Sequence, residues 1–414
     1  MKYKEIDLTV TDDHRNLKQS IYKFSMEVLR PAAIELDSMT PGQVISKGSP
    51  FWQGMEKMYE HSYHAVVLPE AMGGAGLGPL NQHIFWEGLG YGSAGFAIAL
   101  GVGVFAPLAV AMLGGGESQI KEFVEPFLNC KDASVLSCWA ITEPNHGSDN
   151  LAVGTDHFRS PKISQQVRAV KKGNKYIVSG QKSAWVSCGP VATNAVLFLG
   201  IDSSKGMAGG GVCIIDLTQS GVSKGVPLNK IGQRELPQGE IFFDNAEVPE
   251  ENMIVLPEGY ENVLRAVLAH ANSCIMAPVF VGVAQSAYDL ALQYCSERKV
   301  GGKLLCEHQL TKKRLFDMFM RIELARAFSR RVMHYNMTSG TPDLKYAIAS
   351  KVHCTNTAFE VANEAVQLFG GYGLSKEYPI EKIFRDARAS LIEDGTNESL
   401  SLVGGNIIAQ ELMN

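Results

Sequence analysis

The sequence predicts a fold of the α+β class in three consecutive parts: an N-terminal helical domain, a middle antiparallel β domain and a C-terminal helical bundle. The apolar residues repeat with a helical period up to about residue 130 and again after Gly259. Between these parts, short runs rich in β-branched residues alternate with turn residues, as strands do. We therefore expect domains over residues 1–134, 135–256 and 257–414.

The composition is that of a globular protein without a bias toward nucleic acid. The 38 Lys and Arg residues are outnumbered by 43 Asp and Glu residues, so the formal net charge is −5 and no basic surplus is available for phosphates. The eight cysteines form no Cys-x-x-Cys pair, and we expect reduced thiols and no metal site. Residues 1–7 already contain two acidic residues and lack the apolar segment of a signal peptide, so a cytoplasmic location is expected.

The N-terminal part consists of amphipathic helices and a glycine-rich loop. One helical face carries Ile21, Phe24, Val28 and Leu29, and another carries Phe51, Met55, Met58 and Tyr59. The glycines of segment 68–80 exclude a long helix there, and residues 117–128 form a further short helix.

An uncharged run from Gly95 to Leu113 is 19 residues long and nominally sufficient to cross a bilayer. It contains three glycines and Pro107, and it has no basic flank that would set an orientation. These features favour a pair of buried core helices, with a membrane span as the alternative.

The middle part reads as a series of short strands. Residues 167–182 predict a hairpin around a Lys-Gly-Asn turn, and three further strands are expected within 194–202, 209–217 and 239–249. Because no long helix separates these strands, we expect an antiparallel sheet or barrel.

The C-terminal part predicts long helices. One runs to about Arg298, and two more cover residues 315–335 and 344–368. Helices of this length with apolar residues on more than one face are typical of a bundle that also buries a subunit interface.

Three motifs lie at the junctions between these parts. Residues 138–149 contain Ile-Thr-Glu-Pro followed by Gly-Ser-Asp, whose backbone N–H groups and hydroxyls suit a heterocycle or a phosphate, although a capped turn fits equally well. Residues 180–187 place Trp185 two positions before Ser187, where a tryptophan is more commonly part of the core. Residues 367–374 carry glycines directly after a helix, without the preceding strand of a Rossmann motif.

In this order, the motifs resemble those of the acyl-CoA dehydrogenase family of flavoproteins over essentially the whole chain. The resemblance also includes Leu-Pro-Glu-x-x-Gly-Gly at 68–74, Phe-Asp-Asn-Ala-Glu-Val-Pro at 243–249 and Gly-Thr-Asn-Glu at 395–398. It implies an N-terminal helical, a middle β and a C-terminal four-helix domain, FAD as cofactor, an acyl-CoA substrate, an electron-transferring flavoprotein as acceptor, and a homotetramer.

The resemblance also implies the roles of individual positions. Around the flavin ring and the pyrophosphate it places Trp139, Ile141, Thr142, Ser148, Trp185 and Ser187. Around the adenine half, partly from a neighbouring subunit, it places Arg298, Gln309, Gln367, Gly370 and Gly371. The last cofactor contacts are Thr396 and Glu398.

The catalytic base is expected near the C-terminus. Abstraction of a proton alpha to a thioester needs a carboxylate in a pocket that raises its pKa toward the working pH. The family usually has Glu directly before Gly-Thr, and here Asp394 holds that place, with Glu393 as the second candidate. His270 lies where some relatives carry a base, but a hydrogen-bonded structural histidine is the more common case.

The substrate pocket is expected to be lined by Leu100, Gly101, Val104, Glu393 and Gly395. Aspartate is shorter than glutamate by one methylene, about 1.5 Å of reach. We therefore expect a branched or alicyclic acyl group rather than a straight chain. Val300-Gly301 and His146 are further departures from the family pattern, with no assigned effect.

The expected reaction is FAD-dependent alpha,beta-dehydrogenation of an acyl-CoA thioester, with Asp394 as the base and hydride transfer to flavin N5. Two alternatives remain open at this point. One is a flavin-dependent monooxygenase or oxidase on the same scaffold, and the other is a non-catalytic CoA- or flavin-binding homologue.

Overall fold

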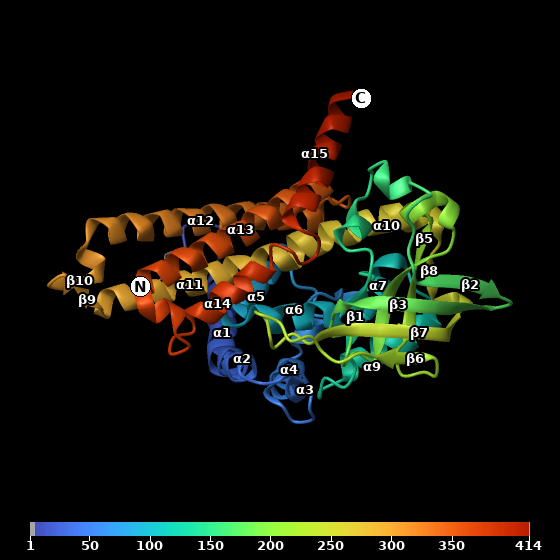
Figure 1. The fold of residues 1–414 in the computed structure, drawn as a ribbon, viewed down its shortest axis with the longest axis horizontal. Coiled ribbons are helices and arrows are strands. Elements are labelled where there is room, and N and C mark those ends of the chain that lie inside the picture. Colours follow the sequence, from blue (N-terminus) through green and yellow to red (C-terminus); the bar gives the residue numbers. More distant parts are fainter. Residues whose placement is uncertain (1–4, 414) are drawn as a thin grey trace.

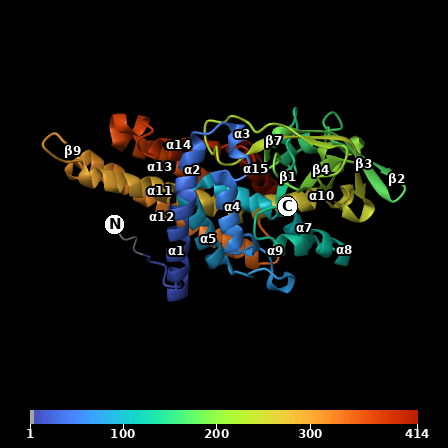
Figure 2. The ribbon, with the colours of Figure 1, turned by 90° about the horizontal axis from the view of Figure 1, so that it is seen from below.

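A computed structural model describes residues 5–413 and shows the three parts side by side (Figure 1). The sheet forms one end of the molecule, and the long C-terminal helices extend from it to the opposite end. The N-terminal helices lie across these long helices, as the view from below also shows (Figure 2). The change from helix to strand falls between Asn129 and Ser137, and the change back falls between Val255 and Pro257.

The N-terminal part is helical, as predicted. Its helices are α1 (Asp12–Phe24), α2 (Arg30–Asp37), α3 (Pro41–Val44), α4 (Pro50–Glu60), α5 (Pro79–Gly92), α6 (Ala94–Gly103), α7 (Phe105–Leu113), α8 (Glu117–Gln119) and α9 (Glu125–Asn129). Proline occupies the first position of α4 and α5, where its fixed φ favours helix entry and no N–H donor is lost from the helix.

The uncharged run forms the expected helix pair, since α6 and α7 meet at a bend of 46° and are mostly buried. By length and composition, the continuous helix Pro257–Glu297 is also apolar enough to cross a membrane. Within the protein, 83% of its most apolar window is buried.

The middle part is a sheet with the strand order β6-β7-β3-β2-β4-β5-β8, and β1 pairs with β4 outside this path. The strands are β1 (Ser137–Ala140), β2 (Arg168–Lys172), β3 (Lys175–Ser187), β4 (Asn194–Gly200), β5 (Gly210–Asp216), β6 (Val222–Lys224), β7 (Gln238–Pro249) and β8 (Met253–Val255). The predicted hairpin is β2–β3, which turns at Gly173 with φ +64°.

Most strand pairs are antiparallel, as expected, but β4 pairs in parallel with both β1 and β2. The sequence-based expectation missed these pairings because the hairpin partner β3 intervenes between β2 and β4 in the chain. The strand β1 arrives directly from the N-terminal helices and lies along β4.

The C-terminal part is dominated by helices. They are α10 (Pro257–His270), α11 (Ala277–Glu297), α12 (Gln309–Thr338), α13 (Leu344–Phe369), α14 (Ile380–Ala389) and α15 (Asn397–Met413). A π-helical segment, Ala271–Met276, joins α10 to α11 without interrupting the long helix. The short strands β9 (Lys299–Val300) and β10 (Lys303–Leu304) follow α11, and α15 projects away from the bundle (Figure 1).

Two glycines bring the backbones of α5 and α11 into contact. A Cβ atom at Gly282 would lie 2.0 Å from the carbonyl oxygen of Glu87, and one at Gly90 would lie 2.1 Å from that of Val279. Backbone atoms cannot move aside as flexible side chains do, so neither position accommodates a larger residue. The N-terminal and C-terminal parts are therefore packed directly against each other.

We expect Gly282→Ala to lower the free energy of unfolding by about 1–3 kcal/mol, because the added methyl group overpacks the α5–α11 contact. Chemical denaturation of the parent and the variant measures the difference. Gly405→Ala is the matched control: Gly405 lies in α15 with no atom within 4 Å of the added Cβ, and there alanine stabilises the helix. Equal stability of Gly282→Ala and the parent would contradict the contact.

Candidate active site

The predicted base lies in a turn between α14 and α15. Asp394 has φ +51° and Gly395 has φ +95°, so two successive residues adopt the left-handed region. Aspartate tolerates this region better than most residues with a side chain. The turn is fixed from two sides: Lys351 Nζ donates to the carbonyl oxygen of Gly395 at 2.9 Å, and the N–H of Thr396 donates to Ser148 Oγ at 3.0 Å.

The two candidate carboxylates differ in their partners. Gln233 Nε2 donates to Glu393 Oε2 at 2.9 Å, whereas no side chain among residues 5–413 donates a hydrogen bond to the Asp394 carboxylate. Burial raises the pKa of Asp394 to about 6, although Lys351 opposes the shift. Burial likewise raises the pKa of Glu393 to about 7. Among the described residues, Asp394 is therefore the one of the two candidates whose carboxylate receives no side-chain hydrogen bond.

His270 is not the hydrogen-bonded structural residue that we expected. Its Nε2 atom is buried and has no hydrogen-bond partner among the described residues. Burial lowers the pKa of its imidazole to about 4, so the ring is neutral and a weak base at neutral pH.

The predicted flavin-side residues lie along β1, the loop after it, and β3. Trp139 is 7% exposed and packs near the rings of Phe105 and Phe198, and its indole N–H has no partner among the described residues. The carbonyl oxygen of Thr142 accepts a hydrogen bond from the N–H of Ser183 at 2.9 Å. This bond sets the loop beside β3.

Trp185 is not a core residue, in contrast to the more common behaviour of a strand tryptophan. Its side chain is 57% exposed. Ser187 lies two residues further along the strand, and its Oγ accepts a hydrogen bond from Gln238 Nε2 at 3.0 Å. An exposed indole beside a fixed hydroxyl is suited to stacking against a planar ligand.

Only some of the residues predicted to bind the adenine half of FAD line one common groove. Arg298, Gly370 and Gly371 line a groove of about 520 Å³ near the end of α11 that also includes Tyr372. The guanidinium of Arg298 lies 5.8 Å from the Tyr372 ring centroid. Gln309 and Gln367 are exposed on α12 and α13. Both ribbon views place the end of α11 far from β3, the strand that contains Trp185 (Figures 1 and 2).

The residues predicted for the acyl end lie in α6. Leu100 and Val104 are buried. A Cβ atom at Gly101 would lie 3.2 Å from Ile275 Cγ2 and 3.6 Å from the Trp86 ring, so this glycine allows close approach of α6 to the π-helical segment. The role of these residues in substrate binding stays a prediction.

The three parts of the chain match three family models. Residues 11–131 match "Acyl-CoA dehydrogenase, N-terminal domain", residues 138–246 match "Acyl-CoA dehydrogenase, middle domain", and residues 258–412 match "Acyl-CoA dehydrogenase, C-terminal domain". The chain belongs to the acyl-CoA dehydrogenase family.

Similar proteins in this family include "Acyl-CoA dehydrogenase, short-chain specific" of Clostridium acetobutylicum, 30% identical over 96% of this chain and 98% of the relative. "Cyclohex-1-ene-1-carbonyl-CoA dehydrogenase" of Geobacter metallireducens is 30% identical over 83% of this chain and 86% of the relative. The solved structure of butyryl-CoA dehydrogenase from Megasphaera elsdenii superimposes with a TM-score of 0.84 at 27% identity and covers 99% of this chain and 100% of its own. The protein is thus an acyl-CoA dehydrogenase-type oxidoreductase with the family's three-domain fold.

FAD is the cofactor of the acyl-CoA dehydrogenase family, and the residues of this chain fit it. The unpartnered N–H of Trp139 and the exposed ring of Trp185 are suited to a heterocycle. At Gly370 and Gly371 a Cβ atom would meet nothing within 4 Å, so the backbone there is open to a ligand. The individual contacts stay predictions.

A buried ion pair missed by the sequence analysis supports the Thr-Glu-Pro loop of this acyl-CoA dehydrogenase. Lys182 Nζ donates to Glu143 Oε1 at 2.7 Å and to the carbonyl oxygen of Ile141 at 3.0 Å. Both side chains are fully buried, and Glu143 also accepts from the N–H of Val167 at 3.0 Å. The sequence did contain a signal for this ion pair. Glu143 lies in the motif 138–149 and Lys182 in the motif 180–187, and the family resemblance implies that both motifs border the flavin.

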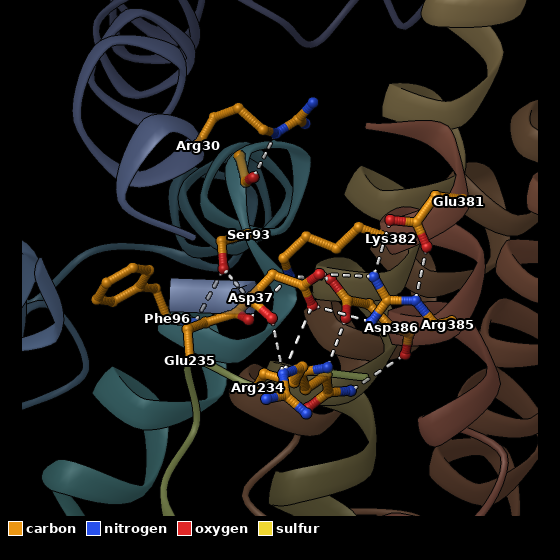
Figure 3. Close-up of polar contacts among 12 residues, drawn as sticks. Arg30, Asp37, Ser93, Phe96, Arg234, Glu235, Glu381, Lys382, Arg385 and Asp386 are labelled. Atoms are coloured by element: carbon orange, nitrogen blue, oxygen red, sulfur yellow. Dashed lines mark hydrogen bonds and ion pairs between the residues drawn. The ribbon is translucent and has the colours of Figure 1, made fainter. Parts of the chain in front are cut away.

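A second buried network connects all three parts of the chain (Figure 3). Glu235 of the middle domain accepts hydrogen bonds from Ser93 Oγ at 2.6 Å and from Lys382 Nζ at 2.8 Å. Lys382 also donates to Asp386 Oδ2 at 2.6 Å, and Asp386 Oδ1 accepts the N–H of Gln233. The spacing of Lys382 and Asp386 on α14 is visible in the sequence, but their partner in the middle domain is not.

We expect Lys382→Met to lower the free energy of unfolding by roughly 3–5 kcal/mol, because Glu235 and Asp386 then share a buried site without their cation. Chemical denaturation measures the change. Lys376→Met is the control, since that side chain is 73% exposed near Asp37 and contributes little. Comparable stability of the two variants would contradict the importance of the buried network.

Proposed function

We propose that the protein dehydrogenates an acyl-CoA thioester between the alpha and beta carbons, with Asp394 as the base. The observation that supports the proposal most strongly is the environment of the Asp394 carboxyl group. It lies in a turn with φ +51°, receives no hydrogen bond from the described side chains, and has a pKa raised to about 6 by burial. A base with these properties is ionised at neutral pH and retains affinity for a proton.

The turn of residues 393–396, called the base turn below, also offers a backbone donor for the substrate. We infer that the N–H of residue 394 donates to the thioester oxygen and stabilises the enolate as the alpha proton leaves. Lys351 donates to the carbonyl oxygen of Gly395, and the N–H of Thr396 donates to Ser148. These two bonds fix the residues that follow Asp394, so its side chain and its N–H are held by one turn. When bound, FAD supplies the acceptor for the hydride that leaves the beta carbon.

The acyl group is proposed to be branched or alicyclic. The shorter reach of Asp394 requires an alpha carbon closer to the turn, and a misplacement of about 1 Å can reduce a rate about a hundredfold. The name of the Geobacter relative, a cyclohexenecarbonyl-CoA dehydrogenase, is consistent with such a substrate. The names of the Clostridium and Megasphaera proteins are instead those of straight short-chain enzymes.

We also propose that the active assembly is a homotetramer that passes its electrons to an electron-transferring flavoprotein. The groove at Arg298 lies where α11 ends, at the end of the molecule opposite the sheet whose strand β3 contains Trp185 (Figure 1). A cofactor that uses both sets of residues therefore needs a second copy of the chain. This supports an assembly with shared cofactor sites.

Replacement of the proposed base tests its role. We expect Asp394→Asn to slow anaerobic bleaching of bound FAD by an acyl-CoA on the order of 10³-fold, since the amide cannot take the proton. Stopped-flow absorbance measures the rate. Glu393→Gln is the matched control, and a loss below about tenfold is expected because Glu393 is already held by Gln233. The reverse ranking would identify Glu393 as the base.

A panel of acyl-CoA thioesters tests the proposed acyl group. We expect cyclohexanecarbonyl-CoA and branched short acyl-CoAs to reduce the flavin faster than straight medium-chain acyl-CoAs, because their alpha carbons approach the shorter base more closely. Steady-state kcat/KM values with an electron-transferring flavoprotein provide the ranking. If octanoyl-CoA proves best, the inference from the length of Asp394 is wrong. Oxygen consumption without the acceptor protein would instead indicate an oxidase.

A further inference from the structure

Lys351 is a fully buried lysine beneath the base turn. It lies on α13, and its side chain has no exposed surface. Its Nζ atom donates to the carbonyl oxygen of Gly395 at 2.9 Å and to Asn397 Oδ1 at 2.9 Å. Removal of an ammonium group from water costs free energy unless polar or charged partners surround it. Packing alone therefore does not account for a lysine at this buried position.

The partners of Lys351 are themselves fixed. Asn397 Nδ2 donates to Thr355 Oγ1 at 3.0 Å and to Asn356 Oδ1 at 3.0 Å. Thr355 Oγ1 in turn donates to the carbonyl oxygen of Lys351 at 2.9 Å. The ammonium group is thus held by α13 and by the start of α15, directly against the residue that follows Asp394.

The charged groups that face Lys351 are acidic. Asp394 and Glu393 belong to the base turn, and Glu398 lies on the first turn of α15. Lys230, from the middle domain, also interacts with Glu393. Lys351 is the cation that lowers the pKa of Asp394 against the effect of burial. Burial lowers the pKa of Lys351 to about 8, so it remains charged at neutral pH.

We propose that Lys351 is a positioning residue for proton abstraction. Its ammonium group holds the left-handed turn through the Gly395 carbonyl and keeps the Asp394 carboxylate ionised at the working pH. This inference rests on the proposed function of Asp394 as the base. Lys351 has no proposed contact with the substrate or with FAD, and it acts through the turn and through its charge.

The experiment measures anaerobic FAD reduction by one acyl-CoA as a function of pH in the parent holoenzyme and in Lys351→Met. The base works only when ionised, so the parent rate rises with pH to a plateau, with a midpoint near the pKa of Asp394, about 6. Loss of the positive charge raises the pKa of the carboxyl group. We expect the midpoint to move upward by about one pH unit and the plateau to fall about tenfold.

Two control variants separate charge from structure. Lys351→Arg retains the charge, and its midpoint is expected to stay close to that of the parent. Lys345→Met makes the same exchange six residues earlier on α13, at a partly exposed lysine that pairs with Glu411, and the whole profile should remain unchanged. If Lys351→Met yields no folded flavoprotein, Lys351→Gln takes its place, since its amide N–H retains a donor while the charge is lost.

Each outcome decides the inference. An upward shift in Lys351→Met or Lys351→Gln, absent from Lys351→Arg and Lys345→Met, supports it. An unchanged midpoint in the neutral variants, while Asp394→Asn is inactive, overturns the role of Lys351 alone. A parent rate in Asp394→Asn instead overturns the proposed function, whatever Lys351→Met shows.

Discussion

The buried contact among Glu235, Lys382 and Asp386 is the interaction on which the arrangement of the three domains depends. In a medium of low dielectric constant, opposite charges attract strongly, and an unpaired charge is severely penalised. The network therefore permits only a narrow range of positions for the middle-domain loop relative to α14 and α6. Gln233 adopts φ +47° in this loop, and its side chain then reaches Glu393, the residue directly before the proposed base Asp394. The geometry of the active site is thus coupled to charge neutralisation at the domain junction.

Buried lysines recur at the junctions of this protein. Lys182 fixes the loop that carries the predicted flavin contacts, Lys382 fixes the three-domain junction, and Lys351 fixes the base turn. Each of these lysines donates hydrogen bonds to a loop or turn. The acceptors are backbone carbonyl groups or carboxylate side chains of that segment. An ammonium group has three donors and can join several such acceptors at one point. In this way a single ammonium group fixes several acceptors of a loop at one point.

The sequence was informative wherever a signal was local. Helical and strand periods predicted the order of the three parts, the β2–β3 hairpin and the buried pair α6–α7, and ordered motifs indicated the family. The parallel pairing of β4 was missed because it depends on where the chain returns to the sheet. Trp185 is exposed although tryptophan on a strand is more commonly buried, and no local pattern in the sequence indicates this exposure. The pairing of Glu235 with Lys382 joins residues 147 positions apart, and no local pattern specifies such a contact. The left-handed conformation of Asp394 is likewise set by contacts with distant residues.

The backbone contact between α5 and α11 has a consequence for how a ligand enters. Helices that touch at Gly90 and Gly282 have no compressible side-chain layer between them, so they behave as one rigid spine through two domains. A hinge motion that separates the N-terminal and C-terminal helices would have to break this spine. We therefore expect an acyl-CoA to enter through changes in loops and side-chain rotamers and not through separation of these two helices.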